Sequence, residues 1–223
     1  MTEAMTQPSE RRDFREWHRG RGPYVFWALD VDSLPVRRRL AAHVRRLGPL
    51  LLEGYVRQPH VTLDICGFPS LSPQLDDEFG RDLLDVQLSA LRCAQPKPFR
   101  IVVGQPASFR SAPYLSVDDV QGGIARLRAC LAINGEHRLL GDYVPHVTIG
   151  LFAEVTPLVE VVACLAAEAA ADALSVAVER LSLMSYEPAE IGGRLDCLAE
   201  YRLTSGQWIW RDAAASRLPF LAR

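Results

Sequence analysis

Two copies of one tetrapeptide carry the residues best suited to chemistry in this 223-residue chain. Residues 59–62 read PHVT within QPHVTLDICGF, and residues 145–148 read PHVT within VPHVTIGLF. Each copy precedes an apolar residue and is expected to begin a short buried strand. Alternate side chains of a strand share a face, so His60 points with Thr62, and His146 points with Thr148. If the two strands lie side by side, two imidazoles and two hydroxyls converge in one cleft.

The structural alternative is a pair of hydrogen-bonded histidines with no chemical role. A single His-x-Thr in a strand is more often structural than catalytic. The chain contains only five histidines, however, and two of them have identical neighbours. The repetition therefore favours a paired functional site over coincidence.

Two histidines across a cleft suit phosphodiester chemistry. A neutral imidazole accepts a proton from the attacking water or hydroxyl, and a protonated one gives a proton to the leaving oxygen. Thr hydroxyls and backbone N–H groups donate to the non-bridging phosphate oxygens, where charge develops. This chemistry requires no metal and no cofactor, and its pH–rate profile is bell-shaped, with pKa values that belong to the pair.

A metal site and a covalent hydrolase are the alternatives. A metal held by the two histidines needs a third ligand, and Asp64, expected on the same strand face as His60, is the obvious candidate. The second copy has Gly150 at that position. A covalent mechanism through Ser or Cys lacks a local signature, since the chain contains no G-x-S-x-G.

Composition places the chain among ordinary soluble proteins, as one large domain or two small lobes. Its formal net charge of −2 gives no general attraction to nucleic acid. Lys97 is the only lysine, and the many arginines fit either bidentate phosphate contacts or a coding bias. The five cysteines are scattered without a CxxC, which predicts a reducing, cytoplasmic location. Glu168 and Asp172 interrupt the longest apolar stretch, so no membrane span is expected.

Three segments are expected along the chain. Residues 1–22 are polar and charged and are predicted to be a flexible N-terminal lead-in. Residues 23–205 form the main domain, and residues 206–223 form a C-terminal packing segment. Within the main domain the expected strands are 24–31, 99–103, 113–118, 174–186 and 195–203, the expected helices are 35–47, 73–94, 120–131 and 156–171, and residues 104–111 are expected to be a turn.

The order strand, helix, PHVT occurs twice. Tyr24 opens the first unit and Tyr114 the second, with Tyr-to-His intervals of 60 − 24 = 36 and 146 − 114 = 32 residues. An internal repeat of this kind predicts two similar lobes related by a pseudo-two-fold axis. The two PHVT strands would then occupy equivalent positions facing one cleft.

The paired motifs resemble those of the 2H phosphoesterase superfamily, in its 2′–5′ RNA ligase-like and cyclic nucleotide phosphodiesterase-like branch. That family is named for two H-x-[ST]-h motifs, h being apolar, as in residues 60–63 and 146–149. The resemblance covers residues 24 to about 204. It also includes the opening YVFWALDVD with its Arg-rich helix, Gly67 and Phe68 after the first motif, and LSLMSYEP and CLAEYRL near the end, with Ser185 and Tyr201.

The resemblance implies an α+β, bilobal 2H phosphoesterase-like fold, in which two pseudo-symmetric lobes with antiparallel sheets line a central cleft and helices lie outside. It implies that His60 and His146 are the acid/base pair and that Thr62 and Thr148 contact the phosphate. Many relatives carry a basic residue shortly after the second motif, where this chain reads Gly150-Leu151-Phe152. Phe68 and Phe152 are candidates to stack a base at the cleft rim, with core packing as the alternative.

The predicted function is metal-independent hydrolysis of 2′,3′-cyclic phosphates of nucleotides or RNA ends, with reversible 2′–5′ RNA joining as the reverse of the same chemistry. The substrate, a nucleotide cyclic phosphate or RNA end, is the only partner that the sequence indicates. One alternative is a module that binds an RNA end or nucleotide without turnover. Another is a hydrolase of cyclic oligonucleotide signals.

Overall fold

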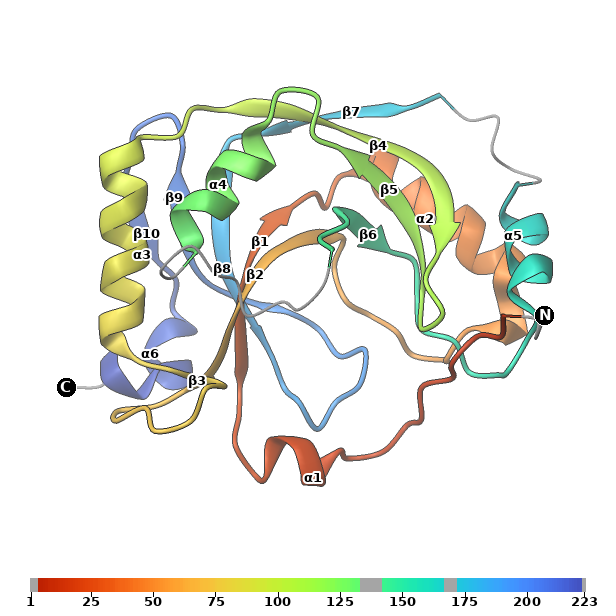
Figure 1. Ribbon diagram of the computed structural model, residues 1–223, viewed down its shortest axis with the longest axis horizontal. Helices are drawn as coiled ribbons and strands as arrows, with labels where there is room; N and C mark the ends of the chain where they lie inside the picture. The colour runs from red at the N-terminus through yellow and green to blue at the C-terminus, as the bar shows by residue number, and fades with distance from the viewer. Residues whose placement is uncertain (1–3, 133–141, 167–171, 222–223) are drawn as a thin grey trace.

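Two curled, mainly antiparallel sheets with helices around them build the molecule, as the computed structural model shows for residues 4–132, 142–166 and 172–221 (Figure 1). The larger sheet has six strands in the order β10-β9-β8-β1-β2-β3, and the smaller has four in the order β6-β5-β4-β7. The strands are β1 (Tyr24–Asp30), β2 (His60–Pro69), β3 (Glu78–Phe79), β4 (Phe99–Ser108), β5 (Pro113–Asp118), β6 (His146–Thr148), β7 (Leu174–Val178), β8 (Arg180–Tyr186), β9 (Asp196–Arg202) and β10 (Trp208–Trp210).

Helices flank both sheets. They are α1 (Arg15–His18), α2 (Leu34–Leu47), α3 (Arg81–Ala94), α4 (Gly123–Leu131), α5 (Leu158–Ala166) and α6 (Ala214–Arg217), with short 3-10 turns at Gly48–Leu50 and Pro219–Leu221. Helices α3 and α4 pack together on one side of the molecule, and α2 and α5 on the other (Figure 1). Among the described residues no helix is both long and apolar enough to cross a membrane.

Helix α2 follows β1 of the larger sheet but contacts the smaller sheet, and α4 follows β5 of the smaller sheet but contacts the larger one. The Arg39 side chain on α2 donates to the Val103 carbonyl of β4 at 3.3 Å. In return, α4 lies against β2, and Arg128 donates to the Leu63 carbonyl of that strand. This exchange of helices ties the two sheets into one core, in which Trp27, Leu63, Leu115 and Phe152 have no exposed surface.

The pairing of β1 with β2 matches the pairing of β5 with β6. Asp30 lies opposite His60 in the first pair, and Ser116 lies opposite His146 in the second. Both pairs are antiparallel. The predicted α+β fold with two pseudo-symmetric, antiparallel lobes is therefore confirmed, and the histidine of each PHVT motif is the first residue of its strand.

The N-terminal segment is packed along the surface, in contrast to the predicted flexible lead-in. The Thr6 amide donates to the Thr156 carbonyl at 2.9 Å, and the Ser9 amide donates to the Phe152 carbonyl at 2.7 Å. Farther on, Arg21 pairs with Asp77 at 2.7 Å. Residues 4–22 thus contact both lobes. Composition alone does not show these contacts, because their partners lie far along the chain.

Three other boundaries differ from those predicted. Strand β4 continues to Ser108 through the residues expected to turn, with a register shift between Val103 and Pro106. Helix α3 begins at Arg81, since the preceding residues form a loop and the short β3. The single strand expected over 174–186 is two strands, β7 in the smaller sheet and β8 in the larger, because the chain crosses between sheets at Glu179. Within residues 206–221, β10 pairs with β9 and so joins the larger sheet.

Candidate active site

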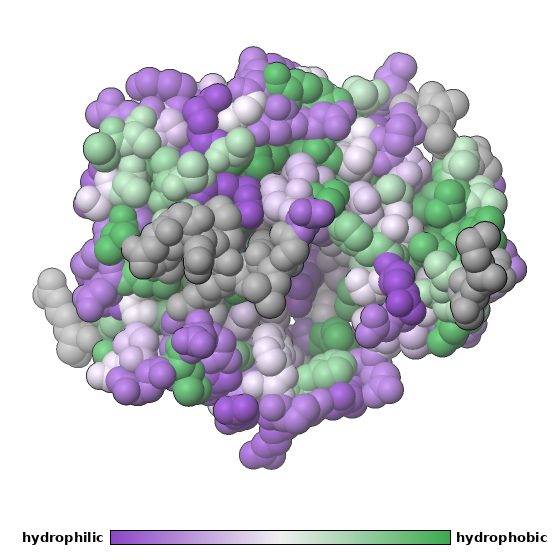
Figure 2. Space-filling view, viewed as in Figure 1, coloured by the Kyte–Doolittle hydropathy of each residue, from purple (hydrophilic) through white to green (hydrophobic). Residues whose placement is uncertain are grey.

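The two PHVT motifs lie at the start of strands β2 and β6, which are in contact across the two sheets. Figure 2, in the orientation of Figure 1, shows the surface hollowed near the centre of this face, where Figure 1 places β2 and β6. The Thr62 and Thr148 side chains are partly exposed, as is His146, whereas His60 is 9% exposed. The intervening Val61 and Val147 are fully buried, so the alternation expected of the motif is present in both copies.

Both imidazoles make the same hydrogen bond. Nδ1 of His60 lies 2.8 Å from the Gln58 carbonyl oxygen, and Nδ1 of His146 lies 2.7 Å from the Val144 carbonyl oxygen. A carbonyl can only accept, so Nδ1 carries the proton in each ring. In the neutral form Nε2 is then an acceptor, and in the protonated form it is a donor. The repeated bond orients both rings and leaves Nε2 for proton exchange.

The segment before each motif reaches the other motif. The Tyr143 hydroxyl, three residues before His146, donates to the Thr62 carbonyl at 2.9 Å. The Tyr55 hydroxyl, five residues before His60, shares a hydrogen bond with the Thr148 side chain. These reciprocal bonds fix the two motifs relative to each other. Sequence analysis assigned no role to either tyrosine.

An apolar layer lines the sheet face behind His60. Phe26, Ala28, Met184 and Leu195 form a cluster separate from the main core, with Ile65 and Tyr186 packed against it. The Phe26 ring centroid is 5.5 Å from that of His60. Apolar neighbours disfavour a charged imidazole, since they replace water that would solvate it.

Burial is the main cause of the altered proton affinity of both histidines. It lowers the pKa of His60 from 6.5 to about 4, against the opposing effect of the hydrogen bond to Gln58. The positive charges of Arg57 and of a protonated His146 lower the pKa of His60 further, whereas the Asp30 carboxylate raises it. Burial also lowers the pKa of His146, opposed by its bond to Val144. The two imidazoles are therefore close enough to influence each other.

Arg57 brings a positive charge to the His60 side of the site. Its guanidinium carbon lies 4.0 Å from the Tyr186 ring centroid, and it shares a hydrogen bond with the Tyr186 hydroxyl. Its Nε is buried and has no hydrogen-bond partner among the described residues. The sequence signal for this residue is its place three positions before His60, together with the missing cation after the second motif.

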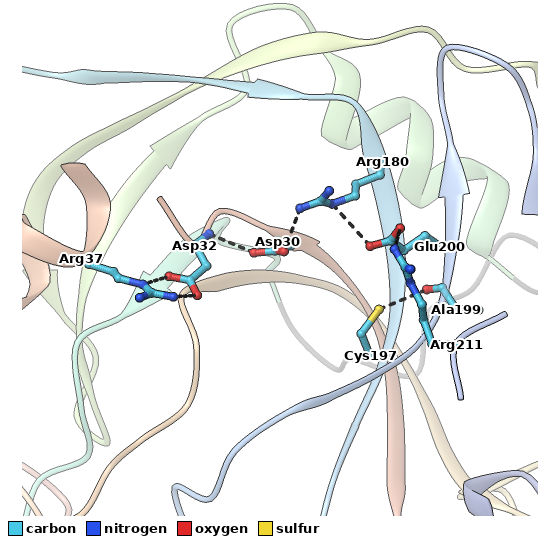
Figure 3. A network of polar contacts seen from close by, with 8 residues as sticks. All are labelled: Asp30, Asp32, Arg37, Arg180, Cys197, Ala199, Glu200 and Arg211. Atoms are coloured by element: carbon cyan, nitrogen blue, oxygen red, sulfur yellow. Dashed lines mark hydrogen bonds and ion pairs between the residues drawn. The ribbon is translucent and has the colours of Figure 1, made fainter. Parts of the chain in front are cut away.

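Asp30, opposite His60, belongs to a chain of charged contacts (Figure 3). Arg180 lies between two carboxylates, 3.1 Å from Asp30 and 3.6 Å from Glu200. Glu200 also pairs with Arg211, and Asp30 accepts from the Asp32 amide at 2.9 Å. The Asp30 charge is thus compensated by Arg180, so the balance of charge beside His60 is positive.

Two aromatic rings flank His146. Phe109 and Tyr114 face each other across the β4–β5 hairpin, with ring centroids 4.2 Å apart and planes at 25°. Their centroids lie 5.0 Å and 5.3 Å from that of His146, in edge contacts. Tyr114 is opposite Thr148 in the strand register, which places the two side chains on the same sheet face.

The structure does not support base stacking by Phe68 or Phe152. Phe152 is fully buried in the core, and Phe68 is 1% exposed and packs against Trp17 and Tyr24. Both phenylalanines therefore pack in the interior, which was the alternative to base stacking. The alternation of side chains along a strand placed both rings at the cleft rim. It could not show that other segments of the chain cover them.

Asp64 does not lie where the metal alternative requires a third ligand. A register shift leaves Asp64 opposite Trp27, whose side chain is in the core, whereas His60 is opposite Asp30. Asp64 therefore leaves the strand face that it was expected to share with His60. Within the described ranges, no group of three or more His, Cys, Asp or Glu side chains is arranged to hold a metal ion.

Comparison with known proteins identifies a family. The family model of the 2′-5′ RNA ligase superfamily matches residues 32–190. No curated protein matches the chain by sequence. The crystal structure of TT0787 from Thermus thermophilus aligns with a TM-score of 0.54 at 17% identity, over 82% of this chain and 100% of that one. E. coli LigT in its apo form aligns with a TM-score of 0.53 at 15% identity, over 83% of this chain and 100% of LigT. E. coli LigT complexed with 3′-AMP gives 0.50 at 16% identity, with the same 83% and 100% coverage.

Proposed function

Because the chain belongs to the 2′-5′ RNA ligase superfamily of 2H phosphoesterases, we propose that it hydrolyses 2′,3′-cyclic phosphates of nucleotides or RNA ends. The observation that carries the proposal is the duplicated bond from an imidazole Nδ1 to the carbonyl two residues earlier. Two rings held alike, each with Nε2 left for proton exchange, are what a paired acid and base require. The complex of E. coli LigT with 3′-AMP supports a nucleotide ligand.

His60 is assigned as the general base. A base has to be deprotonated at the working pH, and the pKa of His60, lowered to about 4, keeps its Nε2 free of a proton. Nε2 accepts a proton from water while the water oxygen forms a bond to phosphorus. The apolar layer at Phe26 and the charge of Arg57 sustain this protonation state.

His146 is then the general acid. It is the more exposed of the two rings; burial lowers its pKa as well, but Arg57 is not among the causes. Its Nε2–H gives a proton to the ribose oxygen as the bond from phosphorus to that oxygen breaks. The ring opens to a phosphate monoester, and proton exchange with solvent restores both histidines.

Thr62 and Thr148 contact the non-bridging phosphate oxygens in this proposal. Each lies two residues after its histidine and shares its strand face. A hydroxyl that donates to these oxygens stabilises the charge that develops during attack. The cysteine pattern supports a cytoplasmic location for the reaction, and none of the five cysteines forms a disulfide.

The test is hydrolysis of 2′,3′-cyclic nucleotides in EDTA by wild type, His60→Ala and His146→Ala. Loss of one general acid or base is expected to reduce kcat by about 10²- to 10⁴-fold. His43→Ala is the matched control, because His43 is also buried but lies on α2. Circular dichroism checks that each variant is folded.

Three outcomes separate the candidate functions. Turnover in EDTA that collapses in both site variants, and not in the control, supports the two-histidine hydrolase. Nucleotide affinity without turnover of any cyclic phosphate, including cyclic oligonucleotides, indicates a binding module instead. Equal activity in wild type and both variants would refute the assignment of the site.

A further inference from the structure

The two ends of the candidate site differ in chemistry, and this difference sets the direction in which a substrate lies. We propose that the cleft binds a nucleoside phosphate in one orientation, with Arg57 on the phosphate and the Phe109–Tyr114 pair stacked on the nucleobase. This inference rests on the proposed function and specifies its substrate as a nucleoside derivative. It assigns a base-binding surface and an anion-binding group to residues outside the PHVT motifs.

Arg57 has donors to offer an anion. Its Nε is buried and has no hydrogen-bond partner in the described part of the chain. The Tyr186 ring, 4.0 Å from the guanidinium carbon, supports one face of the group without neutralising it. A buried N–H without a partner is costly, and a bound phosphate satisfies it with a charge-assisted hydrogen bond.

Arg57 lies at the His60 end and not midway between the histidines. The Tyr186 ring that its guanidinium covers lies 5.9 Å from the Phe26 ring, and the Phe26 ring lies 5.5 Å from that of His60. The segment after the second motif, Gly150-Leu151-Phe152, offers no cation of its own. Arg57 therefore supplies, from the other lobe, the positive charge that this segment lacks.

The Phe109–Tyr114 pair meets the requirements of a stacking surface. Both rings are only partly buried, in contrast to Phe68 and Phe152, and they are already stacked on each other. They lie against His146 and, through the register of Tyr114 with Thr148, on the same sheet face as the motif. An aromatic ring that stacks a base contributes about 1–3 kcal/mol to binding, with little sequence preference.

The experiment compares two substrates that differ only in the base. Adenosine 2′,3′-cyclic phosphate carries both groups that the proposal recognises, and ribose 2,3-cyclic phosphate carries only the phosphate. Phe109→Leu is expected to lower kcat/KM for the adenosine substrate by about 5- to 150-fold more than for the ribose substrate, from the stacking contribution. Arg57→Gln is expected to lower both by about 10- to 150-fold, from one charge-assisted hydrogen bond.

Matched controls are Trp210→Leu, a partly exposed ring on β10, and Arg38→Gln, an exposed arginine on α2. Both are expected to behave as wild type. Equal losses for the two substrates in Phe109→Leu, or no loss, would overturn the base-binding surface. Unchanged activity in Arg57→Gln would overturn the anion site.

Binding measurements test the proposed orientation even if the protein does not hydrolyse cyclic phosphates. If wild type turns over neither substrate, dissociation constants for 2′-AMP and ribose 2-phosphate are compared in the same variants. Selective loss of 2′-AMP affinity in Phe109→Leu then supports the orientation in a protein that does not hydrolyse cyclic phosphates. Similar losses for both ligands would refute the orientation.

Discussion

Protonation of His60 should weaken the fold as the pH falls, by an amount that the buried site determines. The pKa of His60 is about 4 in the folded protein and 6.5 when the ring is in water, a difference of 6.5 − 4 = 2.5. At 1.36 kcal/mol per pH unit, the full effect is about 3.4 kcal/mol. The unfolded chain binds the proton more readily, so stability from this group is lost as pH falls from 6.5 toward 4.

The measurable part of this effect lies above pH 5, where most carboxylates remain ionised. With these two pKa values, protonation of His60 favours the unfolded state by about 2 kcal/mol at pH 5 and by less than about 0.1 kcal/mol at pH 7.5. Urea unfolding at both pH values gives the change for wild type. The same measurement on His60→Gln, whose side chain does not titrate, gives the change due to all other groups.

The difference between the two proteins isolates His60. We expect wild type to lose about 2 kcal/mol more than His60→Gln between pH 7.5 and pH 5. An NMR titration of the His60 ring provides an independent reading of its pKa. A difference below about 0.5 kcal/mol would mean that the ring titrates near its ordinary value. The assignment of His60 as the base with the lower pKa would then be refuted.

Three further predictions concern single positions. Arg57→Gln removes a charge that lowers the pKa of His60, so the acidic limb of kcat/KM should move to higher pH; an unmoved limb contradicts this. Tyr55→Phe removes the hydrogen bond to the Thr148 hydroxyl and should lower kcat/KM by about 2- to 12-fold, from 0.5–1.5 kcal/mol; unchanged kinetics would show that the bond is dispensable. Gly67 has φ +106°, so Gly67→Ala should cost about 1–3 kcal/mol in urea unfolding, and wild-type stability would refute the strain.

The elements that carry the motifs were predictable because local sequence determines them. An alternating apolar strand, an apolar stripe at helical period and the PHVT repeat are all visible in the chain, and β1, α2 and β2 follow them closely. Strand β4 was cut short in the prediction because Gly104 and Pro106 resemble turn residues. In the structure Gly104 lies within β4, close to the neighbouring strand β5. A Cβ at this position would lie 2.7 Å from the Ser116 hydroxyl oxygen.

The remaining site residues depend on tertiary contacts that the sequence does not show. Arg57 and Tyr55 lie in an irregular loop whose course is determined by the other lobe, where residues 50–52 run beside residues 151–153. Phe109 lies within residues 104–111, which were predicted to be a turn although β4 continues to Ser108. The burial of Phe68 comes from the N-terminal segment, through Trp17. Each error arose from a partner distant in sequence.

The strand register corrects the alignment of the two repeats and shows that the two motifs are equivalent while their surroundings differ. Matching Tyr24 to Tyr114 gave unequal intervals, whereas the positions opposite the histidines, Asp30 and Ser116, give 60 − 30 = 30 and 146 − 116 = 30 residues. In this register Ala28, opposite Thr62, is equivalent to Tyr114, opposite Thr148. The motifs are therefore superposable, while their partner strands place a carboxylate in one lobe and an aromatic ring in the other. The two histidines therefore make the same backbone hydrogen bond but have different neighbours, which is what the proposed acid and base roles on an asymmetric substrate require.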